Sequence, residues 1–384
     1  MHECGRLGDV FCHPEFPPNH GSGNEFRMTP YLLKDQGITM NLLAPIELLN
    51  LQEAPEDKVL SFDPSNFDEY LGQDGVKGKL KVYVEAAKMR QEPLDHFLLF
   101  GPPGLGKTTL ARVIAKEMGV PMKITSAPIL ERTGDLVAIL SSIGPSEILF
   151  IDEIHRLPKN VEEILYSAME QFCVDVIIGQ GAGAKSIRLP LQRFTLIGAT
   201  TKTSLISGPL QTRFGIVERL DFYEPADLSH IVMQNAQFLG MPILPEAALC
   251  IGKRARGTPR IVKRILRRVR DFAQVHKFPI IDTQIVDQAL HFLGIDEDGL
   301  NKLDRDLLMH IIKDFGGGPV GVETLAAMTG EERETLEDVV EPFLLRMGLL
   351  QKTPRGRMIP AKKIPLLVRK LGGIVSPEQG SLFE

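Results

Sequence analysis

Residues 101–109 read GPPGLGKTT, which matches the phosphate-binding pattern G-x-x-x-x-G-K-[ST] in full and indicates the fold around it. An apolar run, FLLF at residues 97–100, precedes it, and a helical pattern over residues 108–118 follows it. In such a strand–loop–helix unit, glycines let backbone N–H groups enclose phosphate oxygens at the positive end of the helix. We therefore expect Lys107 to reach the β- and γ-phosphates of a nucleotide and the Thr108 hydroxyl to ligate Mg²⁺.

A second motif, ILFIDE at residues 148–153, is an apolar strand that ends in two carboxylates. Solvated acids at a strand end are common, but after a phosphate-binding loop the pair is typical of a Walker B motif. Asp152 is then expected to hold Mg²⁺ through water, and Glu153 to polarise the attacking water. The two motifs together predict hydrolysis of a nucleoside triphosphate.

A third apolar strand, residues 195–199, ends in Thr200 and Thr201, whose hydroxyls can orient a water near the γ-phosphate. This signal is weak alone, because threonine is an ordinary strand residue. Arg213 is a candidate arginine finger that acts on a neighbouring subunit, with a surface salt bridge as the alternative. Arg260 begins a basic helix and could contact the phosphates from there.

The rest of the chain indicates an α/β protein of two or three domains. Its 384 residues are 43% hydrophobic and 24% charged, which excludes collagen-like and wholly disordered chains. Short apolar strands alternate with helical patterns from about residue 67, as in a parallel sheet buried on both faces. Residues 224–295 read as helical only, and residues 303–360 as helices followed by a strand pair.

The cysteine content and the targeting signals of the sequence indicate in which cellular compartment the protein is expected. Four cysteines without a framework spacing favour a reducing environment. No uncharged apolar run reaches the roughly 18 residues of a membrane helix, and no secretory signal is visible. We therefore predict a cytoplasmic protein with no membrane partner. Residues 1–60 are rich in proline and glycine and predict a poorly ordered extension, which we expect to be dispensable.

The net charge of −5 hides two basic runs. Residues 253–270 hold nine basic residues and residues 352–370 hold seven, with no acidic residue in either. Each run alone fits either a polyanion-binding surface or a solvated helix face. In the second run, a tight hairpin after three expected helices predicts a winged helix. Its turn carries Lys352, Arg355 and Arg357 with no acid nearby, which suits phosphate contacts along duplex DNA.

These motifs, in this order, resemble the RuvB family, the AAA+ motors of Holliday-junction branch migration. A phosphate-binding loop alone indicates only an ATPase, so the discriminating segments are FGGGPVG (315–321) and TPRGR (353–357). The resemblance extends over roughly residues 67–373. Further matching segments are DEYLGQ (68–73), DEIHR (152–156), RFG (213–215), GTPR (257–260) and ETLAA (323–327).

The resemblance implies a parallel-sheet AAA+ P-loop domain (61–224), a helical lid (225–297), a C-terminal winged helix (298–373) and a tail (374–384). It implies a homohexamer that uses ATP to pump duplex DNA at Holliday junctions, in recombination, DNA repair and the SOS response. A RuvA-like junction-binding protein would dock on a hairpin from Val174 to Leu189, and a RuvC-like resolvase is a further possible partner. From its residues alone, this segment predicts either a hairpin with an exposed apolar tip or a core hairpin.

The resemblance also assigns site residues, position by position. Glu153, Arg213 and Thr201 (sensor 1) match the family's catalytic residues, and Thr108 and Asp152 match its Mg²⁺ ligands. Some of the ATP-binding positions, namely Glu170, Gln171, Phe172 and Arg213, are expected at a neighbouring subunit's nucleotide. The full ATP-binding set comprises Phe62, Asp63, Gly104, Lys107, Thr108, Thr109, Glu170, Gln171, Phe172, Arg213, Tyr223 and Arg260 (sensor 2).

Two positions depart from the family pattern. Asp63 stands where relatives have an arginine near the nucleotide, and Gln211 stands where many relatives have an arginine. Two other classes of protein remain possible: an ATP-binding switch of the clamp-loader type, and a winged-helix regulator with a nucleotide sensor. Glu153 and Arg213 disfavour the regulator, because a sensor needs neither, and the 174–189 hairpin and the basic turn favour the motor over the switch.

Overall fold

The computed structural model describes residues 62–178 and 185–371. The expected extension over residues 1–60, the tip of the expected 174–189 hairpin and the tail over residues 374–384 lie outside the described residues.

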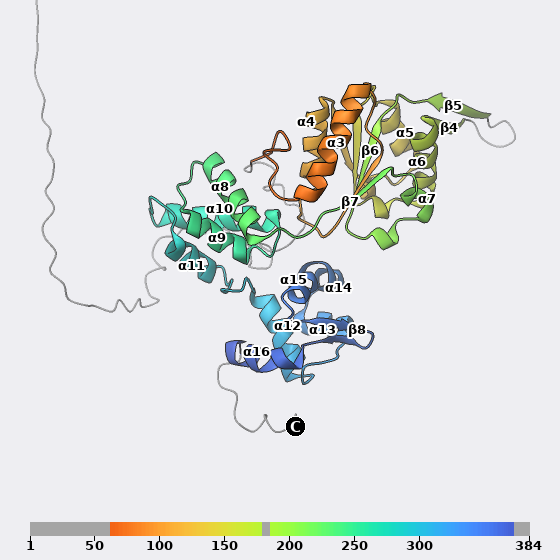
Figure 1. Cartoon of the computed structure of the whole chain (residues 1–384). Coiled ribbons are helices and arrows are strands. Elements are labelled where there is room, and N and C mark those ends of the chain that lie inside the picture. Colours follow the sequence, from red (N-terminus) through yellow and green to blue (C-terminus); the bar gives the residue numbers. More distant parts are fainter. Residues whose placement is uncertain (1–61, 179–184, 372–384) are drawn as a thin grey trace, which may run out of the picture. The chain divides into compact units, whose positions relative to one another are not determined.

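A five-stranded parallel sheet with the order β2-β3-β6-β1-β7 organises the first domain (Figure 1). Phe97 and Leu99 point into one core, whereas Leu98 between them points into another. Both faces of the sheet are therefore covered, which is why its strands read as unbroken apolar runs. The strands are β1 (Phe97–Phe100), β2 (Met122–Ser126), β3 (Ile148–Asp152), β6 (Thr195–Thr200) and β7 (Ile216–Arg219).

Helices cover the two faces of this sheet. Leu80 of α3 and Leu110 of α4 are fully buried in the first core, and Leu136 of α5 and Leu165 of α6 are fully buried in the second. The alternation of strands and helices confirms the predicted α/β class. The helices are α3 (Asp74–Arg90), α4 (Lys107–Met118), α5 (Thr133–Ser141), α6 (Lys159–Gln171) and α7 (Gly208–Gln211), with short 3₁₀ turns at Ala127–Ile129, Ile154–Arg156 and Thr203–Leu205.

An antiparallel pair leaves this domain between α6 and β6. It consists of β4 (Cys173–Ile178) and β5 (Lys185–Pro190), with Val174 opposite Leu189. Val174 is buried, whereas Ile187 is 44% exposed and Leu189 is 36% exposed. The pair therefore buries Val174, as expected for a core hairpin, and presents apolar side chains on β5 to solvent; the tip that was the other expectation lies outside the described residues.

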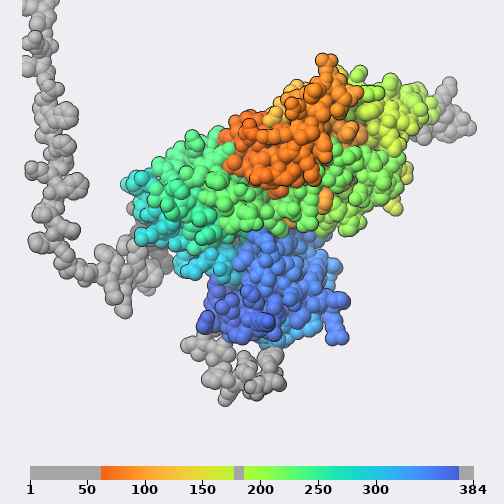
Figure 2. All heavy atoms as spheres, in the orientation of Figure 1, coloured from red at the N-terminus to blue at the C-terminus, as the bar shows by residue number. Residues whose placement is uncertain are grey.

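Four helices follow, as the absence of strand patterns predicts: α8 (Pro225–Phe238), α9 (Pro245–Arg254), α10 (Pro259–Val275) and α11 (Thr283–Phe292). Strand-like pairing here is limited, within the described residues, to one bridge between Ile243 and Ile281. Their buried residues, such as Ile251 and Ile265, join the core that covers the α3–α4 face of the sheet. In the space-filling view, these helices (green to teal) form a closely packed surface (Figure 2).

The last part of the described chain is a winged helix with its own core. The helix expected over residues 331–348 is interrupted by a π turn at Leu336–Val340. Pro342 follows this turn; because proline lacks an N–H and clashes with the preceding turn, it breaks regular helical pairing there. The elements are α12 (Lys302–Lys313), α13 (Val322–Thr329), α14 (Arg333–Thr335), α15 (Glu341–Arg346), β8 (Gln351–Thr353), β9 (Gly356–Met358), a 3₁₀ turn (Ala361–Lys363) and α16 (Ile364–Leu371).

Across the described ranges, none of these helices is both long enough and apolar enough to span a membrane.

Candidate functional site

The phosphate-binding loop joins β1 to α4, and its glycines adopt conformations that other residues disfavour. At Gly101, with φ +146°, a Cβ atom would clash with the carbonyl oxygen of Leu220. Gly106, with φ +91°, is the N-cap of α4, so the first amides of the helix open toward the loop. Lys107 Nζ donates to the carbonyl oxygens of Gly101 and Pro102, at 2.8 and 3.0 Å. Burial lowers the pKa of Lys107 to about 8.

The two carboxylates lie at the end of β3, where Asp152 is the last residue and Glu153 follows it, at the same edge of the parallel sheet as the loop. Asp152 Oδ1 accepts a hydrogen bond from the Glu153 backbone N–H at 2.9 Å. Glu153 has φ +49°, a left-handed conformation that is uncommon for a residue with a side chain. Its Oε2 accepts from Arg156 Nη1 at 3.0 Å. Backbone strain of this kind gathers at functional sites, which supports a role for Glu153 beyond folding.

The two threonines after β6 separate into different environments. Thr200 is fully buried, and its Oγ1 lies 2.9 Å from His155 Nδ1 and accepts from the Lys202 backbone N–H at 3.0 Å. Thr201 instead lines the cavity that the loop and the carboxylates share. Burial lowers the pKa of His155, so the ring that contacts Thr200 favours its neutral form. Of the two hydroxyls, Thr201 is the one placed to meet a ligand.

A cavity of about 660 Å³ brings most of the predicted site together, and its size is within the range of small-molecule sites. Three basic residues that were not predicted also line it: Arg112, Arg156 and Lys263. Arg112 follows Thr108 by one helical turn, so its position was visible in the sequence as the same face of α4. The predicted residues that line the cavity are Asp63, Gly104, Lys107, Thr108, Thr109, Asp152, Glu153, Thr201 and Arg260.

The segment that departs from the family pattern reaches this cavity through Asp63. Its Oδ2 lies 3.0 Å from Lys116 Nζ on α4. Phe62 does not line the cavity; its backbone N–H donates to Asn235 Oδ1, and its carbonyl oxygen accepts from Lys263 Nζ, both at 3.1 Å. Phe62 therefore ties this segment to α8 and α10, whereas Asp63 is the residue that can meet a nucleotide.

Tyr223 lies behind the loop instead of facing the cavity. Its hydroxyl is 3.0 Å from the Tyr70 hydroxyl and 3.3 Å from the Leu105 carbonyl oxygen, and its side chain is buried. Its backbone N–H donates to the Gly257 carbonyl oxygen at 2.9 Å. Tyr223 thus supports the phosphate-binding loop from the segment that leads into the basic helix.

The first basic run does not form one solvated face. Arg260 and Lys263 line the cavity, and the Arg260 backbone N–H lies 3.4 Å from the Gly104 carbonyl oxygen. Arg264 and Arg267 are 7% and 5% exposed. The interpretation as a solvated helix is wrong for these four residues, because α10 packs between the other lid helices and the cavity.

Arg213, the candidate finger, does not line the cavity of its own chain, and neither do Glu170, Gln171 or Phe172. The Arg213 Nη1 donates to the Pro209 carbonyl oxygen at 2.6 Å. Its Nε forms an ion pair with Glu170 Oε1 at 3.1 Å, without hydrogen-bond geometry, so the salt bridge that was the alternative to a finger is present within the chain. Phe172 packs edge-on against Phe194, with ring centroids 6.0 Å apart.

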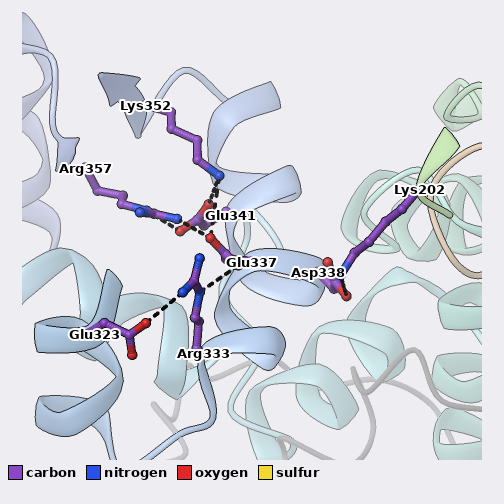
Figure 3. A network of polar contacts seen from close by, with 8 residues as sticks. All are labelled: Lys202, Glu323, Arg333, Glu337, Asp338, Glu341, Lys352 and Arg357. Atoms are coloured by element: carbon purple, nitrogen blue, oxygen red, sulfur yellow. Dashed lines mark hydrogen bonds and ion pairs between the residues drawn. The ribbon is translucent and has the colours of Figure 1, made fainter. Parts of the chain in front are cut away.

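The basic turn of the winged helix differs from the sequence expectation (Figure 3). Arg357 is 8% exposed; its Nε donates to Glu341 Oε1 at 2.6 Å and its Nη2 to Glu337 Oε1 at 2.8 Å. Lys352 Nζ donates to Glu341 Oε2 at 3.3 Å. The prediction that no acid lies near this turn is wrong, because the preceding helical segment supplies both carboxylates. Arg355 is exposed at the turn and keeps its predicted accessibility.

A glycine-rich loop before a helix, a buried lysine and a carboxylate pair at the end of a second strand of the same parallel sheet define a P-loop nucleoside triphosphatase. The helical lid that contributes Arg260 and the winged helix after it narrow this class to AAA+ proteins with a DNA-binding domain.

Three family models match consecutive parts of the chain and agree with this class of protein. The Holliday junction DNA helicase RuvB P-loop domain matches residues 62–220, the RuvB AAA lid domain residues 223–296, and the RuvB C-terminal winged helix domain residues 297–367. The chain therefore belongs to the RuvB family of Holliday junction DNA helicases, which are P-loop ATPases.

Solved structures support the same assignment. The chain is 47% identical to the RuvB Holliday junction branch migration motor of Thermotoga maritima, with a TM-score of 0.72, over 82% of this chain and 99% of that one. A single-substitution variant of the Thermotoga protein is 48% identical, with a TM-score of 0.73, over 80% of this chain and 98% of that one.

Proposed function

We propose that this chain is an ATP-driven motor that migrates Holliday junctions in recombination and DNA repair, as a homohexameric ring that pumps duplex DNA. The observation that carries the proposal is the shared cavity in which the phosphate-binding loop, both Walker B carboxylates, Thr201 and Arg260 meet. A motor needs to couple hydrolysis to movement, and here the cavity is lined from the sheet domain, the lid and the winged helix. The cytoplasm and the SOS response remain predictions from the sequence and the resemblance.

The residues fit a nucleotide with Mg²⁺. Within the described ranges, no group of three His, Cys, Asp or Glu side chains is arranged to hold a metal by itself. In proteins Mg²⁺ is held by one or two protein oxygens together with phosphates and water. The Thr108 hydroxyl and the Asp152 carboxylate would supply those oxygens, and bound Mg²⁺ would neutralise charge that develops on the phosphates.

The chain's own groups then have distinct tasks. Gly104, Lys107, Thr108 and Thr109 hold the phosphates at the positive end of α4. Glu153 accepts a proton from the attacking water, and Thr201 orients that water. Arg260 contacts the phosphates from the lid, while Asp63 lies at the nucleoside end and Phe62 and Tyr223 support the site from outside it.

Arg213, with Glu170, Gln171 and Phe172, acts on the nucleotide of a neighbouring subunit. The support for this is that all four lie outside their own chain's cavity. An arginine finger supplied by a neighbour is worth about 10³–10⁵ in rate in phosphoryl-transfer systems. Hydrolysis in one subunit thus depends on the placement of the next.

DNA and protein partners occupy other surfaces. Arg355 on the turn of the winged helix contacts phosphates of duplex DNA. The exposed Ile187 and Leu189 of β5 belong to the surface that docks a RuvA-like junction-binding protein. A RuvC-like resolvase is a further partner that the resemblance suggests.

A branch-migration assay on synthetic four-way junctions, with and without a RuvA partner, tests this function. The wild-type chain should convert junctions to duplex products in the presence of ATP, and Glu153→Gln should not. A protein that hydrolyses ATP on DNA yet never moves a junction would instead be a switch of the clamp-loader type.

A further inference from the structure

The candidate arginine finger rests on an aromatic ring of its own chain. The Cζ atom of Arg213 lies 4.4 Å from the centroid of the Tyr166 ring. Tyr166 belongs to α6, whereas Arg213 follows the short helix α7. A guanidinium over an aromatic face at this distance is attracted by the ring quadrupole.

The ring itself is held by a second layer of polar contacts. The Tyr166 hydroxyl donates to Glu162 Oε1 at 2.6 Å and lies 3.1 Å from Ser207 Oγ. Ser207 is the N-cap of α7, where its Oγ accepts from the Leu210 backbone N–H at 3.2 Å. Ser207 Oγ also contacts Glu162. One network thus joins the ring to the start of the helix that leads to Arg213.

Hydrogen bonds hold both the backbone and the guanidinium of Arg213. Its backbone N–H donates to the Leu210 carbonyl oxygen at 3.2 Å, and its Nη1 donates to the Pro209 carbonyl oxygen at 2.6 Å. The Nε donor is buried and makes no hydrogen bond within the described residues, although Glu170 Oε1 is 3.1 Å away. Together with the Tyr166 ring, the Pro209 carbonyl oxygen and the Glu170 carboxylate hold the guanidinium from within its own chain.

We infer that Tyr166 is a positioning residue for the arginine finger: its ring sets the plane and direction in which Arg213 meets a neighbouring subunit's nucleotide. The inference rests on the proposed role of Arg213 in trans. Tyr166 itself touches no reacting atom. Its effect comes from holding a flexible side chain near its productive geometry before the neighbour arrives, which lowers the cost of ordering it during hydrolysis.

Two substitutions separate the ring from the hydroxyl. Tyr166→Leu removes the ring and should lower kcat about three- to thirtyfold, the range expected when a cation–π interaction is removed, while KM for ATP stays near the wild-type value. Tyr166→Phe keeps the ring and should remain within about threefold of wild-type kcat, because it removes only the hydroxyl that faces Glu162 and Ser207. A fall in kcat as large for Tyr166→Phe as for Tyr166→Leu would overturn the assignment to the ring.

Hydrolysis by mixed rings distinguishes a positioning role of Tyr166 from a role in folding alone. Subunits with Lys107→Ala cannot hold their own nucleotide but still present Arg213; subunits with Arg213→Ala hold nucleotide but lack the finger. Mixing the two should restore part of the hydrolysis. Adding Tyr166→Leu to the Lys107→Ala subunit should then reduce the restored rate about three- to thirtyfold, whereas adding it to the Arg213→Ala subunit should leave that rate unchanged.

The mixing experiment distinguishes a failure of the trans role of Arg213 from a failure of the positioning role of Tyr166. If Lys107→Ala and Arg213→Ala subunits restore no hydrolysis on mixing, Arg213 does not act in trans, and the inference about Tyr166 falls with it. If they do restore it, and Tyr166→Leu lowers the rate equally from either subunit or from neither, only the positioning role of Tyr166 is overturned.

Discussion

Lys107 combines burial with a place at the positive end of α4. It is 8% exposed, its Nζ contacts two loop carbonyl oxygens, and burial lowers its pKa from 10.5 to about 8. Phosphate charge favours the ammonium form and so raises this pKa again when a nucleotide binds. At the scale of single residues, nucleotide binding and proton uptake are therefore linked in this site.

The first prediction concerns that linkage. Above pH 8 the empty protein holds Lys107 partly neutral, so ATP binding should take up a proton, and affinity should fall by up to about tenfold per pH unit between about pH 8 and 10. Calorimetry at pH 9 in two buffers of different ionisation enthalpy measures the uptake. Binding at pH 6.5, where Lys107 is already charged, is the control, and a heat that does not depend on the buffer at pH 9 would contradict the prediction.

The second prediction separates holding phosphate from activating water. Lys107→Ala should abolish tight ATP binding, whereas Glu153→Gln should leave binding intact and lower turnover by a factor of about 10²–10⁴, the usual contribution of a general base. Fluorescent-nucleotide titration and steady-state phosphate release measure the two effects. Turnover by Glu153→Gln close to that of the wild-type chain would remove the role given to this carboxylate.

At the scale of elements, the basic turn of the winged helix has two kinds of cation. Arg357 is directed inward to Glu341, which is 3% exposed, whereas Arg355 is exposed at the turn. A charge with buried partners serves the fold, and an exposed one is available to a phosphate. Replacement of Arg357 should therefore lower the stability of the fold, whereas replacement of Arg355 should weaken DNA binding.

The third prediction tests this division with a matched pair of variants. Arg357→Ala leaves the buried Glu341 with the solvent-exposed Lys352 as its remaining ion-pair partner among the described residues, and should cost about 3 kcal/mol in free energy of unfolding, measured by urea denaturation. Arg355→Ala should leave that free energy unchanged and weaken DNA binding alike for all sequences. It should also flatten the log–log salt dependence by about 0.9 for each DNA phosphate that the variant no longer neutralises. Equal decreases in stability in both variants would contradict the division.

At the scale of the whole molecule, one buried ion pair links the lid to the winged helix. Arg256 is 3% exposed and Asp304 is fully buried, and their side chains are in contact. The guanidinium also lies over the Phe343 ring, 4.5 Å from its centroid. Next along the chain, Gly257 has φ +73°, and a Cβ there would clash with the guanidinium of Arg346 from α15. The segment that ends in Arg260 is thus packed directly against the DNA-binding domain.

The fourth prediction concerns this pair. Arg256→Met removes the charge that faces Asp304 and should cost about 3–5 kcal/mol in free energy of unfolding, because a buried carboxylate is left without its partner. Asp304→Asn in the same chain should recover much of that loss, since the amide keeps an oxygen for the Asn301 backbone N–H, 2.8 Å away. Urea denaturation of both variants measures the effect; a loss below about 1 kcal/mol in Arg256→Met would show that the pair does not hold the domains.

The class of fold and the centre of the site follow from local patterns in the sequence. Wholly apolar strands, glycines at 101–106 and carboxylates after residue 151 are local patterns, and local backbone geometry turns them into a parallel sheet and a phosphate-binding loop. Thr108, Asp152, Glu153 and Thr201 meet in one cavity for this reason, because each lies at a strand end or a helix start at the same edge of the sheet. Arg260 reaches that cavity from the lid helix α10.

The partner of each remaining charged side chain depends on how the elements pack against one another. Arg357 belongs to a basic run in the sequence, yet α15 and the π turn bring Glu341 and Glu337 against it. Arg213 is separated in sequence from Tyr166, and packing of α7 near α6 places one on the other. A local pattern specifies the element that carries a side chain, but the free energy of a buried charge depends on groups from other elements, which no single segment contains.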